Sequence, residues 1–374
     1  MTDYNSIYNS RLTAWFMRKT LSSGVRRVAT LSAAIASDIG SVRKENQDRV
    51  AITQGQDFSG HSFILAALSD GIGGMKNGAE CAATALGGFF SAFLEKSQLD
   101  GEPDQWLSSA AFKSNSAVHD KFNGSGGATL AAILIRGNGS AHWLNIGDSR
   151  VYHSDGTKLT QISVDDTISG QLGQQSDANM GQSQLLQFIG MGKQLEPHVS
   201  RFDAGLQGSV LLTSDGIHFL DSVWLGQIVG HSPDHGICAR RLTEIAKWCG
   251  GPDNASVAMI SLDVAVDTPV HQKNYGYDIW DPFGELQIQI IVDSDRRMPT
   301  VPNVPESTAS KPESFAHQEQ ANLSGNPGGL PKSKQKRASR KQKRITTKHK
   351  EDLGKSKESP EISQLIIEYP NKAT

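Results

Sequence analysis

The sequence predicts an α+β fold with antiparallel sheets, and two observations lead to this class. Short apolar runs of strand length recur within residues 31–265 and are separated by glycine and aspartate turns. Helical patterns interrupt these runs without the regular strand–helix alternation of a parallel sheet, which favours antiparallel pairing. The expected strands are residues 62–68, 128–136, 141–146, 209–213 and 255–262.

Two or three helices are expected between these strands. After Gly78, apolar residues recur at the i, i+3, i+4, i+7 spacing of a helix packed on a core. A second helix is expected to begin at Asp104, a favourable N-cap residue. A third covers residues 237–248 and ends before Gly250-Gly251-Pro252. The expected core-facing residues are Ala82, Ala85, Leu86, Phe89, Phe90 and Phe93 in the first helix, and Leu107, Ala111, Val118 and Phe122 in the second.

The composition excludes several protein classes. The chain has 374 residues and only three cysteines, Cys81, Cys238 and Cys249, too far apart for a CxxC motif or a disulfide scaffold. The longest apolar runs are much shorter than the roughly 20 residues of a membrane-spanning helix. We therefore expect no membrane span and a location in the reducing cytoplasm.

Changes in composition divide the chain into four parts. Residues 1–30 are an unassigned extension, 31–265 the main domain, and 266–299 an appended segment with one strand in residues 286–290. Residues 300–374 are expected to be mostly disordered, since they contain few large apolar side chains. Within this tail, residues 331–350 hold 10 of the 37 basic residues and no acidic residue. The apolar residues 362–369 are either a docking motif or a frayed end, and the frayed end is favoured.

Aspartates at strand ends are the main candidates for chemistry. Asp48, Asp70, Asp148, Asp215 and Asp253 each lie beside an apolar run and near a Gly, Ser or Asn residue. If the strands end at one edge of a sandwich, these carboxylates meet and repel each other unless a cation binds. An all-oxygen ligand set favours Mg²⁺ or Mn²⁺ over Zn²⁺ or Cu²⁺. A single Asp-Gly is usually a turn, so the prediction depends on the joint occurrence of these motifs.

The same pattern suggests how phosphate esters could be hydrolysed. Two ions about 3.5–4 Å apart can share a carboxylate and a water whose lowered pKa yields hydroxide near neutral pH. Gly71 could offer its carbonyl to an ion because it has no Cβ. Arg43 could clamp the non-reacting phosphate oxygens, although taken alone it would be interpreted as a surface ion pair. Arg150 is interpreted as a structural partner of Asp148.

On these residues the sequence resembles the metal-dependent Ser/Thr protein phosphatases of the 2C type, the PPM family, in their bacterial form. The resemblance implies two packed antiparallel sheets flanked by helices. It also implies that Asp70, Gly71, Asp215 and Asp253 hold two Mn²⁺ or Mg²⁺ ions, with Asp48 close by, directly or through water. Asp148 is then a candidate ligand of a third ion. The matching segments are Gly40-Ser-Val-Arg43, Asn46-Gln-Asp48, Asp70-Gly-Ile-Gly-Gly74, Gly78-Ala-Glu80, Gly126-Gly-Ala-Thr129, Asn145-Ile-Gly-Asp-Ser-Arg-Val-Tyr152, Ser214-Asp-Gly216 and Asp253-Asn-Ala-Ser256.

Three departures from the family pattern concern the substrate side of this site. Ile72 stands where animal members have a His proposed as general acid and bacterial members usually have Met. Val164-Asp-Asp-Thr167 replaces the usual Asp-His-Ser. The flap at residues 168–192 lacks the usual Arg-Asn before Gly190. Substrate choice is therefore the property expected to differ most from the family.

The resemblance implies hydrolysis of phosphoserine or phosphothreonine in proteins by a metal-bridging water, in signal transduction opposed by a Ser/Thr kinase. One alternative is a catalytically silent scaffold that keeps the fold and binds a polyanion or a partner through residues 331–350. Another is phosphatase chemistry on a small molecule. Metal dependence would separate the enzyme from the scaffold, whose polyanion binding should weaken as salt rises.

Overall fold

The computed structural model describes residues 2–75, 77–171, 184–202, 207–262, 276–291 and 363–368. All of them belong to one compact unit, which comprises residues 1–293 and 361–374. No helix among the described residues is long and apolar enough to cross a membrane. The basic run at residues 331–350 and most of the expected disordered tail lie outside the described residues.

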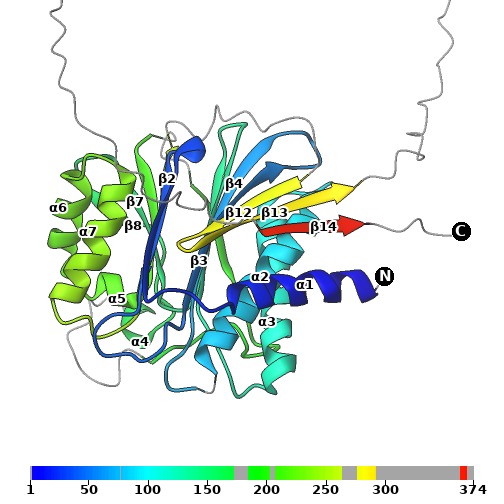
Figure 1. The fold of residues 1–374 in the computed structure, drawn as a ribbon, viewed down its shortest axis with the longest axis horizontal. Helices are drawn as coiled ribbons and strands as arrows, with labels where there is room; N and C mark the ends of the chain where they lie inside the picture. Colours follow the sequence, from blue (N-terminus) through cyan, green and yellow to red (C-terminus); the bar gives the residue numbers. More distant parts are fainter. Residues whose placement is uncertain are drawn as a thin grey trace, which may run out of the picture. The chain divides into compact units, whose positions relative to one another are not determined.

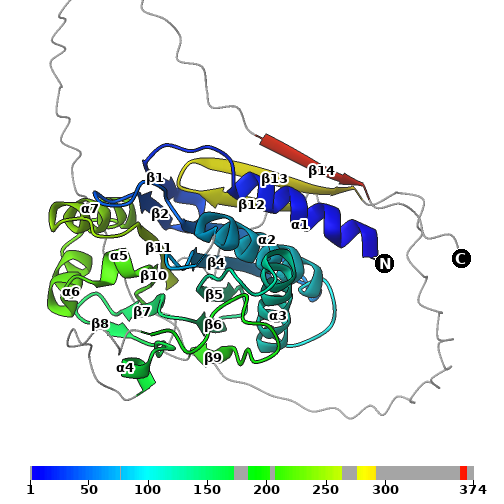
Figure 2. The same ribbon diagram turned by 90° about the horizontal axis from the view of Figure 1, so that it is seen from below.

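Two sheets form the middle of this unit, and helices cover their outer faces (Figures 1 and 2). The eight-stranded sheet has the order β14-β13-β12-β3-β4-β5-β6-β9, with β3 Asp48–Gln56, β4 Ser62–Asp70, β5 Leu130–Arg136, β6 Ala141–Ile146, β9 His198–Phe202, β12 Gly276–Asp281, β13 Gly284–Ile291 and β14 Ser363–Glu368. The six-stranded sheet has the order β1-β2-β11-β10-β7-β8, with β1 Ser23–Val28, β2 Ala33–Asp38, β7 Arg150–Ser154, β8 Leu159–Gln161, β10 Ser209–Thr213 and β11 Ala255–Ser261. All strand pairs are antiparallel except β13 with β14.

The helices lie in two groups, one on each sheet. Helices α1, α2 and α3 lie beside the eight-stranded sheet, and α5, α6 and α7 lie beside the six-stranded sheet (Figures 1 and 2). Their bounds are α1 Thr2–Phe16, α2 Gly78–Lys96, α3 Pro103–Phe122, α4 Ile168–Gln171, α5 Asp215–His218, α6 Ser222–Gly230 and α7 His235–Trp248, with a short 3₁₀ helix at Ala29–Leu31. The predicted α+β class with two packed antiparallel sheets is confirmed.

Three apolar clusters hold these layers together. One lies between the two sheets and includes Ile35, Ile52 and Leu68. A second joins the eight-stranded sheet to α1, α2 and α3, and a third joins the six-stranded sheet to α5, α6 and α7. Phe89 and Phe93 of the predicted α2 stripe are fully buried in the second cluster. Burying such a side chain contributes about 1.5–3 kcal/mol, so the apolar pattern accounts for the layer order.

All five expected strands and all three expected helices are present, but the start of α3 differs from the prediction. The helix begins at Pro103, with Glu102 as the N-cap residue. Asp104 lies in the first turn, where its carboxylate contacts Nδ1 of His142 on β6 at 2.6 Å. Proline is well suited to the first helical position because its missing N–H needs no partner there.

The ends of the compact unit also differ from the expected boundaries. Residues 1–30 contribute α1 and β1, and residues 276–291 form a hairpin of two strands rather than one appended strand. Residues 363–368 form β14 along β13, so the frayed-end interpretation does not hold for them. We therefore propose a domain larger than residues 31–265, which takes in both flanking segments.

Candidate active site

Asp48 and Asp70 lie opposite each other at one end of the eight-stranded sheet. Asp48 begins β3, Asp70 ends β4, and the antiparallel register pairs the two residues directly. Asp48 is only 3% exposed, and its Oδ2 accepts a hydrogen bond from the Ser214 hydroxyl at 2.7 Å. Ser214 follows β10, so this bond links the two sheets at the site.

Asp215 and Asp253 come from neighbouring strands of the six-stranded sheet. Asp215 begins α5, with Ser214 between it and the end of β10, and Asp253 lies two residues before β11, which pairs with β10. The charges of Asp48 and Asp215 act on the carboxyl group of Asp70 and raise its pKa. The charges of Asp148 and Asp253 also act on Asp70. The structure therefore brings together all five aspartates identified from the sequence.

Burial and mutual repulsion raise the pKa values of four of these carboxyl groups, those of Asp48, Asp70, Asp148 and Asp215. Burial is the main cause in each case, and it raises the pKa of Asp48 to about 7, of Asp148 to about 7 and of Asp215 to about 6. The pKa of Asp70 is raised well above its usual value by burial and by the neighbouring carboxylates. A bound cation would favour the charged forms again, because opposite charge lowers a carboxyl pKa.

Two buried oxygens at the site lack a hydrogen-bond partner within the part of the chain that the structure describes. They are Oδ1 of Asp48 and Oδ1 of Asp215. A buried polar atom without a partner is costly, and a hard divalent cation satisfies carboxylate oxygens of this kind. The residues present therefore fit Mg²⁺ or Mn²⁺.

Arg43 forms an ion pair with Asp253 in this structure. Nη2 of Arg43 lies 2.5 Å from Oδ2 of Asp253, and this hydrogen bond is the main reason that the pKa of Arg43 is raised. Among the described residues, no three His, Cys, Asp or Glu side chains already converge as a complete metal-ligand set. A metal ion that used Asp253 would therefore compete with Arg43 for this carboxylate.

The glycines after Asp70 allow two close approaches. A Cβ on Gly71 would lie 2.2 Å from the carbonyl oxygen of Gly78, at the start of α2. A Cβ on Gly73 would lie 2.7 Å from Nη1 of Arg43. Gly71 thus lets α2 approach the site, a reason that the sequence analysis did not give, and Gly73 leaves room for the Arg43 guanidinium.

Asn254 holds the loop that carries Arg43 and Asp48, a role that the sequence analysis did not assign. Its Oδ1 accepts from the backbone N–H of Gln47 at 2.7 Å, and its Nδ2 donates to the carbonyls of Ile39 at 2.8 Å and Glu45 at 3.1 Å. The sequence signal that could have indicated this role was its place in the matching segment Asp253-Asn-Ala-Ser256.

Thr129 supports Asp70 in a similar way, also without an assigned role in the sequence analysis. Its hydroxyl accepts from the backbone N–H of Asp70 at 3.0 Å, and its own N–H donates to the Asp70 carbonyl at 2.8 Å. The hydroxyl also lies 2.7 Å from Oγ of Ser149, which connects Asp70 to the turn with Asp148. The sequence signal for Thr129 was its place in the matching segment Gly126-Gly-Ala-Thr129.

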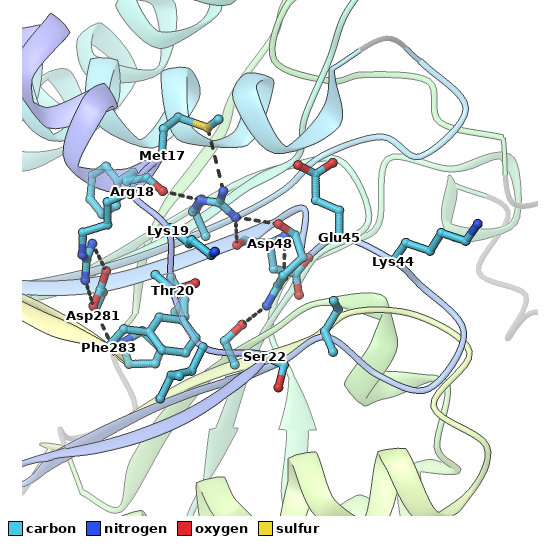
Figure 3. Close-up of a pocket in the computed structure, with 18 residues that line it drawn as sticks. Met17, Arg18, Lys19, Thr20, Ser22, Lys44, Glu45, Asp48, Asp281 and Phe283 are labelled. Atoms are coloured by element: carbon cyan, nitrogen blue, oxygen red, sulfur yellow. Dashed lines mark hydrogen bonds and ion pairs between the residues drawn. The ribbon is translucent and has the colours of Figure 1, made fainter.

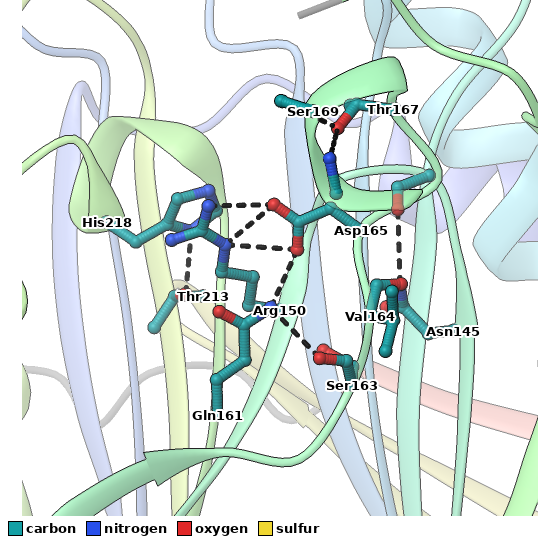
Figure 4. Close-up of polar contacts among 12 residues, drawn as sticks. Asn145, Arg150, Gln161, Ser163, Val164, Asp165, Thr167, Ser169, Thr213 and His218 are labelled. Carbon is teal, nitrogen blue, oxygen red and sulfur yellow. Dashed lines mark hydrogen bonds and ion pairs between the residues drawn. The ribbon is translucent and has the colours of Figure 1, made fainter. Parts of the chain in front are cut away.

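Arg150 pairs with Asp165 rather than with Asp148, which corrects the sequence interpretation. Nη2 of Arg150 lies 2.7 Å from Oδ2 of Asp165, and Gln161 donates to the other carboxylate oxygen at 2.8 Å (Figure 4). The next residue, Asp166, accepts from the backbone N–H of Gly147 at 3.0 Å and contacts His198 at 2.8 Å. The two unusual aspartates of Val164-Asp-Asp-Thr167 therefore hold both sides of the Asp148 turn.

The substrate side of the site is only partly described. Ile72 is half-buried, and its backbone N–H donates to the Gly127 carbonyl at 3.1 Å, so an apolar side chain occupies this position. The flap begins with α4 and continues at residue 184, and its residues 172–183 lie outside the described residues.

Comparison with known proteins identifies the family. The sequence profile described as protein phosphatase 2C matches residues 41–232, about half of the chain. The chain belongs to the protein phosphatase 2C family, and the resemblance found in its sequence is confirmed.

Individual relatives agree with this assignment. The serine/threonine protein phosphatase PstP of Mycobacterium tuberculosis is 31% identical in a match 253 residues long, which covers 63% of this chain and 46% of that protein. The match thus spans about half the length of this relative. The crystal structure of the PPM Ser-Thr phosphatase MsPP from Mycobacterium smegmatis, in complex with cacodylate, is 30% identical with a TM-score of 0.52, covering 62% of this chain and 98% of that one. The crystal structure of PstP/Ppp from M. tuberculosis is 28% identical with a TM-score of 0.50, covering 64% and 98%.

Proposed function

We propose that this chain is a metal-dependent phosphoprotein phosphatase that hydrolyses phosphoserine and phosphothreonine. The observation that carries the proposal is the cluster of buried carboxylates, with unpartnered oxygens on Asp48 and Asp215. Membership in the protein phosphatase 2C family and similarity to PstP support the same activity. The hydrocarbon side chain of Ile72 cannot donate a proton, so the leaving group would take its proton from a water or from another residue.

Asp70, Asp215, Asp253 and the Gly71 carbonyl would hold two Mn²⁺ or Mg²⁺ ions, and Asp48 would lie close by. When bound, the ions supply an activated water and positive charge for the phosphate. Asp148 is the candidate for a third ion, and Asp165 and Asp166 would position it through Arg150 and Gly147.

Arg43 would bind the non-reacting oxygens of the substrate phosphate. Its side chain is 37% exposed and already pairs with one carboxylate oxygen, so an incoming phosphate can exchange for Asp253. A guanidinium can donate two parallel hydrogen bonds to a phosphate, which an ammonium cannot. Arg43→Lys should therefore raise KM for a phosphopeptide about tenfold and change kcat less. An unchanged KM would exclude this role.

The central experiment is hydrolysis of a phosphothreonine peptide across a Mn²⁺ titration. Phosphate release should depend on Mn²⁺, stop in EDTA and fall at least 100-fold in Asp215→Asn. Asp100→Asn, which changes an exposed aspartate after α2, is the matched control and should keep full activity. Release that continues in EDTA would contradict the proposal. Faster hydrolysis of sugar phosphates than of the phosphopeptide would favour a small-molecule substrate.

The partners follow from the proposed activity. The substrates would be phosphorylated proteins, and a Ser/Thr kinase would oppose the enzyme. Residues 331–350 would contact a polyanion, with an affinity that falls as salt rises. Nothing in the described part of the chain favours the silent scaffold, and the titration above separates it from the enzyme. Cys81, Cys238 and Cys249 are all free thiols, which agrees with the proposed location in a reducing cytoplasm.

A further inference from the structure

A second pocket lies behind the loop that joins Arg43 to Asp48. It has a volume of about 480 Å³ and is lined by residues 16–22, the start of β3 with the preceding loop, and the turn at 281–283 (Figure 3). Residues 16–22 and 281–283 lie outside the segment matched by the family profile, residues 41–232. The pocket is therefore built partly from residues outside the segment that the family profile matches.

Arg49 lines this pocket, and its hydrogen-bond acceptors are all neutral, while the carboxylates of Asp48 and Glu45 in the same lining act on it through their charges. Its Nε donates to the Phe16 carbonyl at 2.6 Å, and its Nη1 donates to the carbonyls of Asn46 at 2.8 Å and Asp48 at 2.7 Å. Its Nη2 has the thioether sulfur of Met17 at 3.8 Å, which is a weak acceptor. One nitrogen of this guanidinium thus has capacity for a stronger acceptor.

The two basic residues of segment 16–22, Arg18 and Lys19, differ in whether they form an ion pair. Arg18 is neutralised by Asp281, with Nη1 and Oδ2 separated by 2.7 Å. Lys19 has no ion-pair partner among the residues that the structure describes. In Figure 3 the Lys19 side chain is drawn among the lining residues, whereas Lys44 extends away from them.

We infer that this pocket binds an oxyanion, a phosphate or carboxylate group, between Lys19 and the free side of the Arg49 guanidinium. Hydrogen bonds between charged donors and oxyanions are short and about twice as strong as neutral ones, which suits these two donors. Thr20 lies in the same lining and carries a hydroxyl that can serve as a further donor. The volume exceeds that of one phosphate, so the anionic group belongs to a larger molecule such as a peptide or a small metabolite-sized ligand.

The test is isothermal titration calorimetry of sodium sulfate into the full-length protein in EDTA, at constant ionic strength. Sulfate is the probe because it is an oxyanion that the enzyme cannot hydrolyse, and EDTA removes metal-dependent binding. Sulfate should bind with one site, and Lys19→Gln should weaken it about tenfold, the loss expected for one charged hydrogen bond. Lys19 is exposed, so this variant should fold normally, which circular dichroism checks.

Two further variants locate the bound anion. Lys158→Gln changes an exposed lysine in the turn between β7 and β8 and should leave the affinity unchanged. Arg43→Gln should also leave it unchanged, because Arg43 does not line this pocket. Absence of sulfate binding, or binding lost in Arg43→Gln but kept in Lys19→Gln, would overturn the inference. This outcome is independent of the proposed phosphatase activity.

Competition then identifies the source of the oxyanion. A glutamate-rich peptide without phosphate should displace sulfate if the natural ligand is an acidic polypeptide segment. Inorganic phosphate that displaces sulfate when the peptide does not would indicate a free anion. Either displacement supports the pocket, provided that Lys19→Gln weakens it, and failure of both competitors would contradict the inference.

Discussion

Replacing Asn254 by alanine should loosen the whole loop between β2 and β3. The side chain is 2% exposed and makes three hydrogen bonds, to the backbone of Gln47, Ile39 and Glu45. Each net hydrogen bond contributes about 1 kcal/mol, so Asn254→Ala should lower the free energy of unfolding by about 3 kcal/mol. Asn254→Asp should cost at least as much, because a carboxylate oxygen would then face the carbonyls of Ile39 and Glu45.

Urea unfolding followed by circular dichroism, with EDTA present, measures this loss without a contribution from metal binding. The control is Asn138→Ala in the turn between β5 and β6, where the side chain is exposed and water can replace its bonds to Ser140. It should cost less than about 1 kcal/mol. If Asn254→Ala costs no more than Asn138→Ala, the loop is not held by this side chain. The Mn²⁺ concentration for half-maximal activity should also rise, since the same loop carries Asp48.

Three more predictions concern the site and its support. In EDTA, the contribution of Asp48 to stability should fall as pH rises from about 4 to 7. The reason is that its folded-state pKa of about 7 lies above the unfolded value, so the folded state binds the extra proton in this range. Asp48→Asn should flatten the dependence of the melting temperature on pH over the same range. Gly71→Ala should cost about 1–3 kcal/mol in urea unfolding, because its Cβ would meet a backbone carbonyl at 2.2 Å, whereas Gly74→Ala meets nothing and should be neutral. Asp165→Asn should cost about 1–3 kcal/mol, since it leaves the half-buried Arg150 without its carboxylate, and full stability in a thermal melt would refute this pairing.

Local patterns in the sequence were sufficient for the layers and for the membership of the acidic cluster. The helical stripe of α2 and the apolar strands depend on neighbours within a few residues, so periodicity predicts them. Asp48, Asp70 and Asp215 were found because each ends or begins an apolar run. Helix α1 was missed because its polar sequence has no clear apolar stripe, although Leu12 and Phe16 pack on α2.

Contacts between distant residues could not be derived in this way. Asn254 bonds Gln47 across 207 residues, and nothing local to either residue indicates the other. Arg150 pairs with Asp165 rather than with Asp148, which is nearer in the sequence, because the β7–β8 hairpin brings the chain back beside Arg150. The pairing of β14 with β13 also joins segments far apart in the sequence. It could not be predicted locally, since the edge of a strand can pair with any suitable extended segment.

The position of β14 matters for shortening this protein. Its parallel pairing with β13 runs from Leu286 with Ser363 to Ile291 with Glu368, so β14 is the edge strand of the eight-stranded sheet and covers β13. A chain cut at residue 300 would lose the basic run at 331–350 and would also uncover the backbone N–H and C=O groups of β13. An open edge of this kind promotes aggregation. An internal deletion of residues 331–350 keeps β14 in place, and it therefore isolates the effect of the basic residues from that of an exposed sheet edge.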